Sequence, residues 1–354
     1  MRVLMLAPLW YPVSRDAQGG IETFLYSLIE ALDRQGCSVT LLASGDSRTS
    51  ADVVPVVERN LYSLMLEGRA GEYVYYEQHQ LRLAYGMASG FDVVHSHVGP
   101  GGYVLSAHAE AGGRVLHTVH SPVYADLRWF VGQHPDVRLA AVSEFQAQRL
   151  REAGARCCRV MHNGIDTSGF PFNDRPGDGV LFVGRIEEAK GPDIAIDVAR
   201  ALGRPLTLAG PVIDKDFFKR SIEPRLDGQL RYVGVVDHET KCKLMGEAAC
   251  MLLPFRKAEP FGMVSIEAMA CGTPVVALPN GALPEIVESG VTGYLADDER
   301  ALPSCVLRAM SLDRVRVRDR ATARFGIQHV AGKYLDLYRD MAAGALGGER
   351  QPCA

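Results

Sequence analysis

The sequence predicts an α/β protein of two doubly wound, Rossmann-like domains, each built on a parallel sheet. Its 354 residues are enough to form two ordinary hydrophobic cores. Short apolar segments alternate with amphipathic segments along the chain, which is typical of parallel strands connected by helices. Glycines and charged residues follow directly after several predicted strands, where ligands bind in sheets of this kind.

The first domain is predicted at residues 1–165. Its buried strands are expected at 3–7, 39–43, 53–57, 92–95, 115–119 and 139–142. After the first strand, a loop leads to Gly19 and Gly20, which open an amphipathic helix over 21–35. Two glycines at a helix start let the backbone approach a ligand closely, although a loop that needs positive φ is the alternative.

Polar residues end three further strands of this domain, in the segments 95–97, 118–121 and 143–144. Because His95 and His97 alternate about a strand end, we expect one to face the core and the other the ligand side. A metal site is an alternative on the number of histidines, but carboxylates at ligand spacing are lacking. The histidines of this half are His79, His95, His97, His108, His117, His120, His134 and His162.

The second domain is predicted at 166–325, after a linker at 162–178 in which turn-forming residues concentrate. Its strands are expected at 180–183, 206–209, 230–233 and 275–278, with a helix at 238–249. The turn after the first of these strands carries Arg185 and Lys190. Two cations at a strand-to-helix turn can neutralise a diphosphate, and ordinary surface charges are the alternative.

The segment 259–285 is the most informative part of the chain. Pro260 and Gly262 are expected to open a helix that packs its apolar residues inward, and Gly272 with its neighbours to end it. The inward residues are Val264, Ile266, Ala268 and Met269. The start of such a helix is an anion site.

Two carboxylates of this segment indicate what the anion is attached to. Glu259 would repel a phosphate at the helix start unless a neutral polyhydroxy group lies between them. Glu267 lies eight residues later, where it can reach the diol of a ribose. A sugar, a diphosphate and a ribose in line describe a nucleotide sugar.

The pattern E-P-F-G-M-V-S-I-E-A-M-A-C-G-T-P-V-V-A at 259–277 resembles the retaining glycosyltransferases of family 4, which have the GT-B fold. N-G-I-D at 163–166 is similar to the linker motif of this family. G-A-L-P-E at 281–285 is similar to its G-G-x-P-E, with Ala282 where glycine is more usual, which puts a backbone contact there in doubt.

The resemblance covers about residues 1–343 and implies two Rossmann-like domains facing a central cleft. It also implies that a C-terminal helix at 326–343 crosses back to the first domain, followed by a tail at 344–354.

The resemblance further implies the site residues. The implied catalytic residues are His120, Arg185, Lys190 and Glu259. The implied donor-binding residues are Gly19, Gly20, Gly184, Arg185, Lys190, Val236, Glu259, Phe261, Gly262, Met263, Val264 and Glu267. Loop 234–237 is expected to hold the base through its backbone.

Acceptor recognition is expected from loops of the first domain that are rich in aromatic residues, at 8–18, 67–79, 98–102 and 124–134. The candidate acceptor-binding residues are Trp10, His97, Tyr124 and Glu144.

The expected reaction is the metal-independent transfer of a sugar from a nucleoside diphosphate sugar, with retention, to give an α-glycoside. The expected donor is a UDP-sugar such as UDP-glucose or UDP-GlcNAc, with no cofactor, and the expected acceptor is a small soluble molecule. A lipid-linked or polysaccharide acceptor, or a non-catalytic nucleotide-sugar-binding protein of the same fold, is the alternative. A nucleotide-sugar epimerase or hydrolase is a further alternative, which would consume the donor without an acceptor.

Charge and composition restrict the partners. A net charge of −4 and a pI of about 6.2 give no nucleic-acid footprint. Residues 1–170 hold 14 arginines, no lysine and 17 acidic residues, which argues against attachment to anionic membranes. The eight cysteines show no C-x-x-C pair and no zinc spacing, and the first strand leaves no room for a signal peptide, so a cytoplasmic protein is expected. The sequence does not indicate the oligomeric state.

Overall fold

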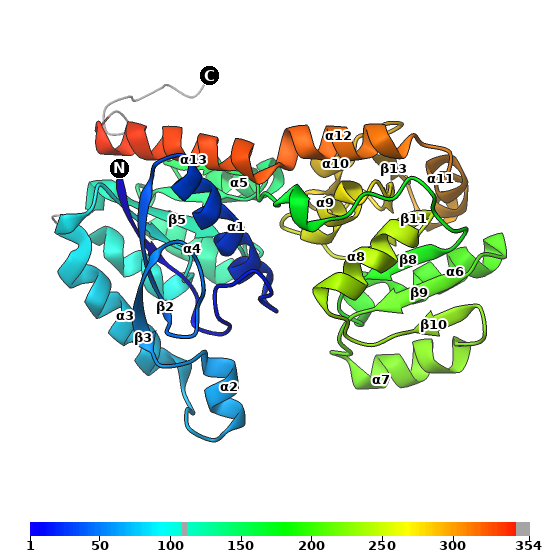
Figure 1. Ribbon diagram of the computed structural model, residues 1–354, viewed down its shortest axis with the longest axis horizontal. Coiled ribbons are helices and arrows are strands. Elements are labelled where there is room, and N and C mark those ends of the chain that lie inside the picture. The colour runs from blue at the N-terminus through cyan, green and yellow to red at the C-terminus, as the bar shows by residue number, and fades with distance from the viewer. Residues whose placement is uncertain (108–111, 345–354) are drawn as a thin grey trace. The chain divides into compact units, whose positions relative to one another are not determined.

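The computed structural model describes residues 1–107 and 112–344, and it divides the chain into two compact units. Unit 1 comprises Met1–Gly164 together with the chain from Ile327 onward, and unit 2 comprises Ile165–Gly326. The helix that the sequence places at 326–343 therefore belongs to the first unit (Figure 1). Both His108 and the tail beyond Gly344 lie outside the described residues.

Unit 1 is built on a sheet of seven parallel strands among the described residues, in the order β3-β2-β1-β4-β5-β6-β7. The strands are β1 (Arg2–Leu6), β2 (Ser38–Ser44), β3 (Asp52–Val57), β4 (Val93–Ser96), β5 (Val115–Val119), β6 (Leu139–Ala141) and β7 (Cys158–Val160). The helices are α1 (Gly20–Arg34), α2 (Leu61–Leu66), α3 (Tyr73–Met87), α4 (Ala125–Gln133), α5 (Glu144–Glu152) and α13 (Ile327–Ala342).

Both faces of this sheet are covered, which explains why its central strands are apolar throughout. On one face α1 and α13 pack together, and their side chains Phe24, Leu28, Tyr334 and Tyr338 are almost fully buried. On the other face α2 and α3 cover β1 and β4 with a second cluster that includes Leu61 and other aliphatic residues. The sheet is thus a rigid support for the loops at its edge.

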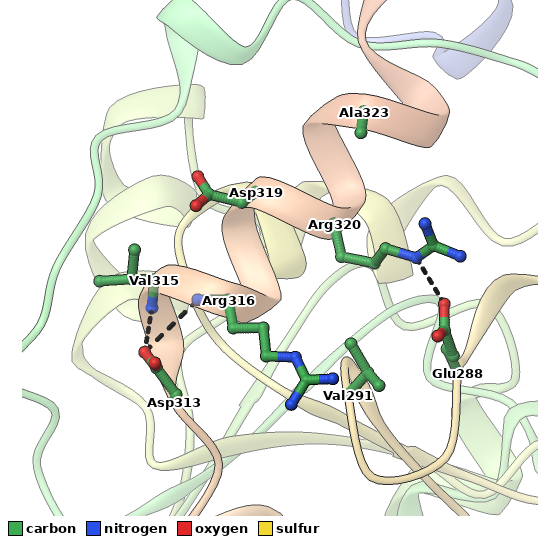
Figure 2. A pocket seen from close by; sticks show the side chains of 8 residues that line it. All are labelled: Glu288, Val291, Asp313, Val315, Arg316, Asp319, Arg320 and Ala323. Carbon is green, nitrogen blue, oxygen red and sulfur yellow. Dashed lines mark hydrogen bonds and ion pairs between the residues drawn. The ribbon is translucent and has the colours of Figure 1, made fainter.

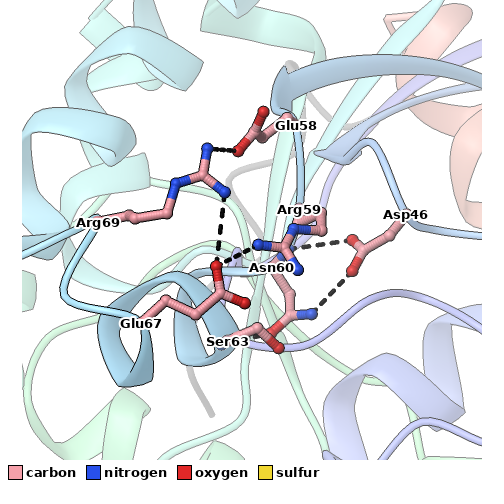
Figure 3. Close-up of polar contacts among 7 residues, drawn as sticks. All are labelled: Asp46, Glu58, Arg59, Asn60, Ser63, Glu67 and Arg69. Carbon is pink, nitrogen blue, oxygen red and sulfur yellow. Dashed lines mark hydrogen bonds and ion pairs between the residues drawn. The ribbon is translucent and has the colours of Figure 1, made fainter.

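The short helix α2 is fixed by a polar network (Figure 3). Asn60 caps the helix by accepting a hydrogen bond from the Ser63 N–H at 3.0 Å, and the Asn60 side-chain amide donates to Asp46 at 2.7 Å. Exposed ion pairs of Arg59 with Glu67 and of Arg69 with Glu58 surround this cap. The Tyr62 N–H at the start of α2 in turn donates to the carbonyl of Trp10 at 3.2 Å. The network therefore holds the loop that follows β1.

Unit 2 is built on a sheet of six parallel strands, in the order β10-β9-β8-β11-β12-β13. The strands are β8 (Val180–Val183), β9 (Leu206–Ala209), β10 (Leu230–Tyr232), β11 (Cys250–Leu253), β12 (Val275–Ala277) and β13 (Gly293–Leu295). The helices are α6 (Pro192–Leu202), α7 (Lys215–Phe217), α8 (His238–Glu247), α9 (Met263–Ala270), α10 (Leu283–Ile286), α11 (Leu302–Ala309) and α12 (Arg314–Phe325).

The predicted fold class is confirmed in each unit, and some predicted elements are wrong in detail. Strands β5, β8 and β9 have the predicted bounds, whereas the short strands β7, β11 and β13 were not expected. Two segments expected as loops are largely helical, since 67–79 runs into α3 and 124–134 is α4. Much of the surface of both helices is exposed, and their aromatic residues do not mark one buried face. No helix among the described residues has the length and apolar content that a membrane span requires.

Strand order reverses once in each sheet, between β1 and β4 in unit 1 and between β8 and β11 in unit 2. In doubly wound sheets the ligand binds at this switch point, beyond the carboxyl ends of the two strands. The loops concerned carry Gly19 and Gly20 after β1 and His97 after β4, and Lys190 after β8 and Glu259 after β11. The topology thus favours these loops as ligand sites, independently of any motif.

Candidate functional site

In unit 2, Lys190 ends a 3₁₀ turn at Glu188–Lys190 that connects β8 to α6. The next residue, Gly191, has φ of +68° and caps the start of α6. A Cβ at Gly191 would lie 2.3 Å from the carbonyl oxygen of Pro254. Only glycine fits there, because both the dihedral angle and the close approach to the backbone exclude a side chain. The position of Lys190 is therefore set by the backbone on its C-terminal side.

The Lys190 ammonium forms an ion pair with the Glu259 carboxylate and lies 4.3 Å from the centre of the Phe255 ring. The two charged side chains are only 15% and 22% exposed. At such burial an ion pair is screened less by water than a surface pair. The sequence assigned these residues to a diphosphate and to a sugar, and the structure brings them into direct contact.

The backbone of Glu259 is held by the segment 281–282. Glu259 forms a parallel β-bridge with Gly281, and the Ala282 N–H donates to the Glu259 carbonyl at 2.9 Å. A Cβ on Gly281 would lie 2.2 Å from that carbonyl oxygen. Ala282 has φ of −81°, so its side chain is accommodated without strain. The hydrogen bond from Ala282 to Glu259 therefore forms with alanine in place of a second glycine.

Three residues after Glu259, Gly262 with φ of +89° precedes the first residue of α9. The first N–H groups of a helix have no partner within it, so this end of α9 offers donors and the positive end of the helix dipole. Phe261, just before this helix start, is buried and packs edge-on against Phe325. Val264, expected to pack inward, is half-exposed instead, because it lies on the solvent side of the first turn.

Glu267 lies on the buried side of α9, and its carboxylate forms an ion pair with the Lys241 ammonium of α8 at 2.9 Å. Lys241 was missed by sequence reasoning. The contact between Lys241 and Glu267 depends on how α8 is aligned against α9, and the sequence gives no signal for that alignment. Two carboxylates of the predicted donor site are therefore each held by a lysine from another element.

The remaining predicted donor residues of unit 2 lie at the carboxyl ends of its strands. Gly184 follows β8, and its N–H donates to the Ala209 carbonyl at 3.0 Å. Arg185 is 57% exposed and pairs with Glu187 at 2.9 Å. Val236 is half-buried in the loop after β10.

In unit 1, Gly19 caps α1 in an extended conformation with φ of −87°, so positive φ is not the reason for this glycine. A Cβ at Gly19 would lie 1.9 Å from the Glu22 carboxylate. Glu22 is almost fully buried at 4% exposure, and burial raises its pKa to about 7 against the opposing effect of the Glu22 and Tyr11 N–H groups. Sequence reasoning missed Glu22, since its position in an amphipathic helix gives no sign of burial.

His120 of unit 1 begins a chain of hydrogen-bonded side chains. His120 Nε2 lies 2.9 Å from His97 Nδ1, and His97 Nε2 lies 3.3 Å from His95 Nδ1. The chain ends where His95 contacts the Tyr338 hydroxyl at 2.6 Å and Thr118 at 2.7 Å.

Both His95 and His97 are almost fully buried, His95 against Tyr334 and Tyr338 of α13 and His97 against Phe24 of α1. Burial lowers the pKa of His120 to about 4, and burial also lowers the pKa of His95 and His97. Within 1–107 and 112–344, no three His, Cys, Asp or Glu side chains gather in a way that could hold a metal ion.

The other candidate acceptor residues lie on the surface of unit 1. Trp10 stacks on Tyr73 with ring centres 4.9 Å apart, and Tyr124 is exposed just before α4. Glu144 is the first residue of α5 and pairs with Arg151 at 2.5 Å.

Two further pockets of unit 2 include none of the predicted site residues. The larger, of about 600 Å³, lies along α12 between Asp313 and Ala323 (Figure 2). There Arg320 pairs with Glu288 at 2.6 Å, and Asp313 caps α12. The second, of about 420 Å³, lies between α8 and the segment 169–173.

Two family models together cover most of the chain. The model for "Glycosyltransferase Family 4" matches residues 18–168, and that for "Glycosyl transferases group 1" matches residues 173–318. The chain belongs to glycosyltransferase family 4. It is thus a glycosyltransferase of the GT-B type, as its resemblance to the family predicted.

Relatives of this family 4 chain include D-inositol 3-phosphate glycosyltransferases. The protein from Jonesia denitrificans is 28% identical over 95% of each chain, and that from Mycolicibacterium smegmatis is 30% identical over 82% of this chain and 78% of its own. A glycogen synthase from Mycobacterium tuberculosis is 32% identical over 70% of this chain and 64% of its own. The solved structure of Anabaena HepE with UDP and glucose has a TM-score of 0.71 at 19% identity and covers 96% of this chain and 100% of its own.

Proposed function

We propose that the protein transfers a hexose from a UDP-sugar to an acceptor hydroxyl, with retention and without a divalent metal. The observation that carries the proposal is the ion pair of Lys190 with Glu259, just ahead of the α9 start. A cation and a carboxylate that can accept hydrogen bonds from sugar hydroxyls thus lie beside the N-terminal end of α9. These are the groups that a sugar joined to a diphosphate requires.

Each part of the donor has a partner in this arrangement. The N–H groups that open α9 and the Lys190 ammonium bind the diphosphate, and the Glu259 carboxylate accepts hydrogen bonds from the sugar. Glu267, with one oxygen held by Lys241, offers its other oxygen to the ribose diol. The structure of Anabaena HepE with UDP and glucose supports UDP as the nucleotide.

The leaving group sets the chemistry. As the bond from the sugar to the phosphate breaks, negative charge develops on the phosphate oxygens, and Lys190 and Arg185 stabilise it in place of a metal ion. The leaving phosphate oxygen takes the proton of the acceptor hydroxyl, which attacks from the same face. The product is an α-glycoside.

The proposed acceptor is a small soluble molecule. Relatives that carry the name of a D-inositol 3-phosphate glycosyltransferase match nearly the whole chain, which supports an acceptor of this size. The similarity to a glycogen synthase favours a polysaccharide acceptor as the second candidate.

The test is turnover of UDP-glucose and UDP-GlcNAc in EDTA, with an inositol phosphate or a glucan primer as acceptor. We expect UDP release that requires an acceptor, and a product with the α configuration by NMR. Arg185→Ala should lower kcat/KM about 100-fold or more, as for loss of one group that stabilises a developing anion. Arg220→Ala changes an exposed arginine of the same unit and should leave the rate unchanged. A β-configured product, or a strict need for magnesium, would refute the proposed mechanism.

A further inference from the structure

A second cluster of reactive groups lies in unit 2, in the pocket of about 420 Å³ beside α8. Cys242 and His238 line this pocket, one turn apart on α8, opposite Gly169 and Phe172. None of the proposed transferase groups lines it. The pocket gives a small molecule a route to a thiol that is otherwise 95% covered, since Cys242 is 5% exposed.

The Cys242 thiol has a basic partner in contact. Cys242 Sγ lies 3.5 Å from His238 Nε2, and the same nitrogen lies 3.0 Å from the Gly169 carbonyl oxygen. A proton on Nε2 can therefore be shared between Gly169 and the sulfur, which fixes the ring against Cys242. Phe170 packs edge-on against the ring of His238 with centres 5.2 Å apart and holds it in this orientation.

A second thiol lies behind the first. Cys271, the residue after α9, is fully buried, and its thiol donates to the backbone carbonyl of Cys242 at 3.9 Å, which places the second sulfur beside Cys242. The neighbouring Cys271 and His238 lower the pKa of Cys242, whereas the proximity of Cys242 and burial raise the pKa of Cys271. The pKa of His238 is raised, chiefly by Cys242. One thiol of the pair is thus activated and the other stays protonated.

The charged and titratable groups around Cys242 are few. Lys241 and His238 from α8 favour the thiolate, and Cys271 comes from α9. Glu239, Lys243 and Glu247 line the outer part of the pocket.

We propose that Cys242 is a modification site, a reactive thiol that a hydroperoxide oxidises and that Cys271 then captures as a disulfide between α8 and α9. Reactive cysteines lie next to a cationic group and can be reached from solvent. Here the His238 imidazole contacts the Cys242 sulfur, and the pocket leads to it. A neighbouring second thiol is the feature that distinguishes redox-sensing cysteines from inert buried ones.

The two steps balance with hydrogen peroxide as the oxidant. The Cys242 thiolate attacks one peroxide oxygen, the O–O bond breaks, and the leaving hydroxide takes the His238 proton to form water. The Cys271 sulfur then attacks the sulfenic acid on Cys242, an S–S bond forms, and a second water leaves. Two thiols lose two electrons in all, and the peroxide is reduced to two waters.

Oxidation reaches the site of the proposed function through the next residue in the chain. Lys241 precedes Cys242 and holds Glu267, and both belong to the helices that the disulfide would join. Oxidation should therefore weaken UDP binding, a consequence that rests on the proposed function.

The reactivity is tested by timed labelling of the reduced full-length protein with iodoacetamide at pH 6 and pH 8.5, with each cysteine followed by mass spectrometry. Cys242 should be labelled at least tenfold faster than Cys157 and Cys305 at pH 6, and His238→Gln should abolish that advantage. Equal rates for the three cysteines at pH 6 would overturn the activated thiol.

The capture step is tested with stoichiometric hydrogen peroxide. A Cys242–Cys271 disulfide peptide should form in the wild type, and Cys271→Ser should instead leave a sulfenic acid on Cys242 that dimedone traps. A wild type that also stops at the dimedone adduct would overturn the role of Cys271. UDP should bind the oxidised protein at least threefold more weakly than the reduced protein, with recovery in dithiothreitol, and unchanged affinity would overturn the link to Glu267. UDP binding to the reduced protein tests the proposed function separately.

Discussion

At the scale of single residues, Glu259 and Lys190 depend on each other, yet the proposal gives them different ligands. Glu259→Gln keeps the size of the side chain and its ability to accept a hydrogen bond, but removes the charge. We expect it to weaken UDP-glucose binding about tenfold, since hydrogen bonds to charged acceptors contribute about 1.5–3 kcal/mol. Binding of UDP alone should change by less than threefold. An equal loss for UDP and UDP-glucose, measured by calorimetry, would argue against contact of Glu259 with the sugar.

Glu22 gives a prediction about pH. Its pKa is raised from 4.5 to about 7, so the folded protein keeps it protonated where the unfolded chain ionises it. The stabilising contribution is complete below pH 4.5 and is lost as the pH rises through 7. In the wild type, ionisation of Glu22 should lower the free energy of unfolding by on the order of 3 kcal/mol as the pH rises from 4.5 through 7. Glu22→Gln should abolish this decrease.

Urea unfolding at several pH values measures this difference between Glu22→Gln and the wild type. Asp33→Asn changes an exposed carboxylate on the same helix and should follow the wild-type profile. Parallel profiles for Glu22→Gln and the wild type would show that Glu22 is ionised in the folded protein.

The sequence predicted residues whose role depends on local motifs, and it failed for residues whose role depends on packing between elements. Lys190 and Glu259 could be named as candidates because a turn and a helix start determine their surroundings. Lys241 and Glu22 were missed, because the register of two helices and the path of the loop after β1 give them their partners.

At the scale of elements, the turn from β8 to α6 gives a prediction with an internal control. Gly191→Ala adds a methyl group at φ of +68° and 2.3 Å from the Pro254 carbonyl. Gly203→Ala, at the other end of α6, adds one at φ of +60° in open space.

Gly203→Ala should lower the free energy of unfolding only by the cost of placing alanine in the left-handed region, about 1–2 kcal/mol. Gly191→Ala should cost more in thermal or urea unfolding and should also weaken UDP binding, because the turn that carries Lys190 has to move. Equal effects of the two substitutions on UDP affinity would show that this turn does not position the donor.

The strands were predicted with uneven success. Buried parallel strands are short apolar runs, and β5, β8 and β9 were located to the residue, whereas the buried strand β11, directly after a predicted helix, was missed. The helices α3 and α4 are exposed over much of their surface, so their aromatic residues resemble those of a binding loop.

At the scale of the whole molecule, the chain returns to unit 1 in α13, so the first unit is complete only when the last helix is in place. Tyr334 is fully buried between α13 and α1. Tyr334→Ala should lower the stability of unit 1 by about 3–5 kcal/mol, the usual cost of truncating a buried aromatic residue.

The measurement is urea unfolding followed by hydrogen exchange in each unit. Tyr75→Ala, which changes an exposed tyrosine on α3, should have little effect. Exchange that accelerates equally in both units after Tyr334→Ala would contradict the assignment of α13 to unit 1.

The two-domain organisation could be predicted because each domain repeats the same alternation of strands and helices. The topology favours ligand sites at the switch points, and the family motifs occur at the same positions. The acceptor could not be predicted, because the exposed residues of unit 1 that would bind it follow no fixed pattern.

The most direct test of the proposed donor site is calorimetric titration of UDP and UDP-glucose into the wild type and Lys190→Ala, in EDTA. The proposal predicts one binding site without metal, at least a tenfold loss of affinity in Lys190→Ala, and no loss in Lys219→Ala, which changes an exposed lysine of the same unit. Equal affinity in Lys190→Ala, or binding only after magnesium is added, would contradict the account.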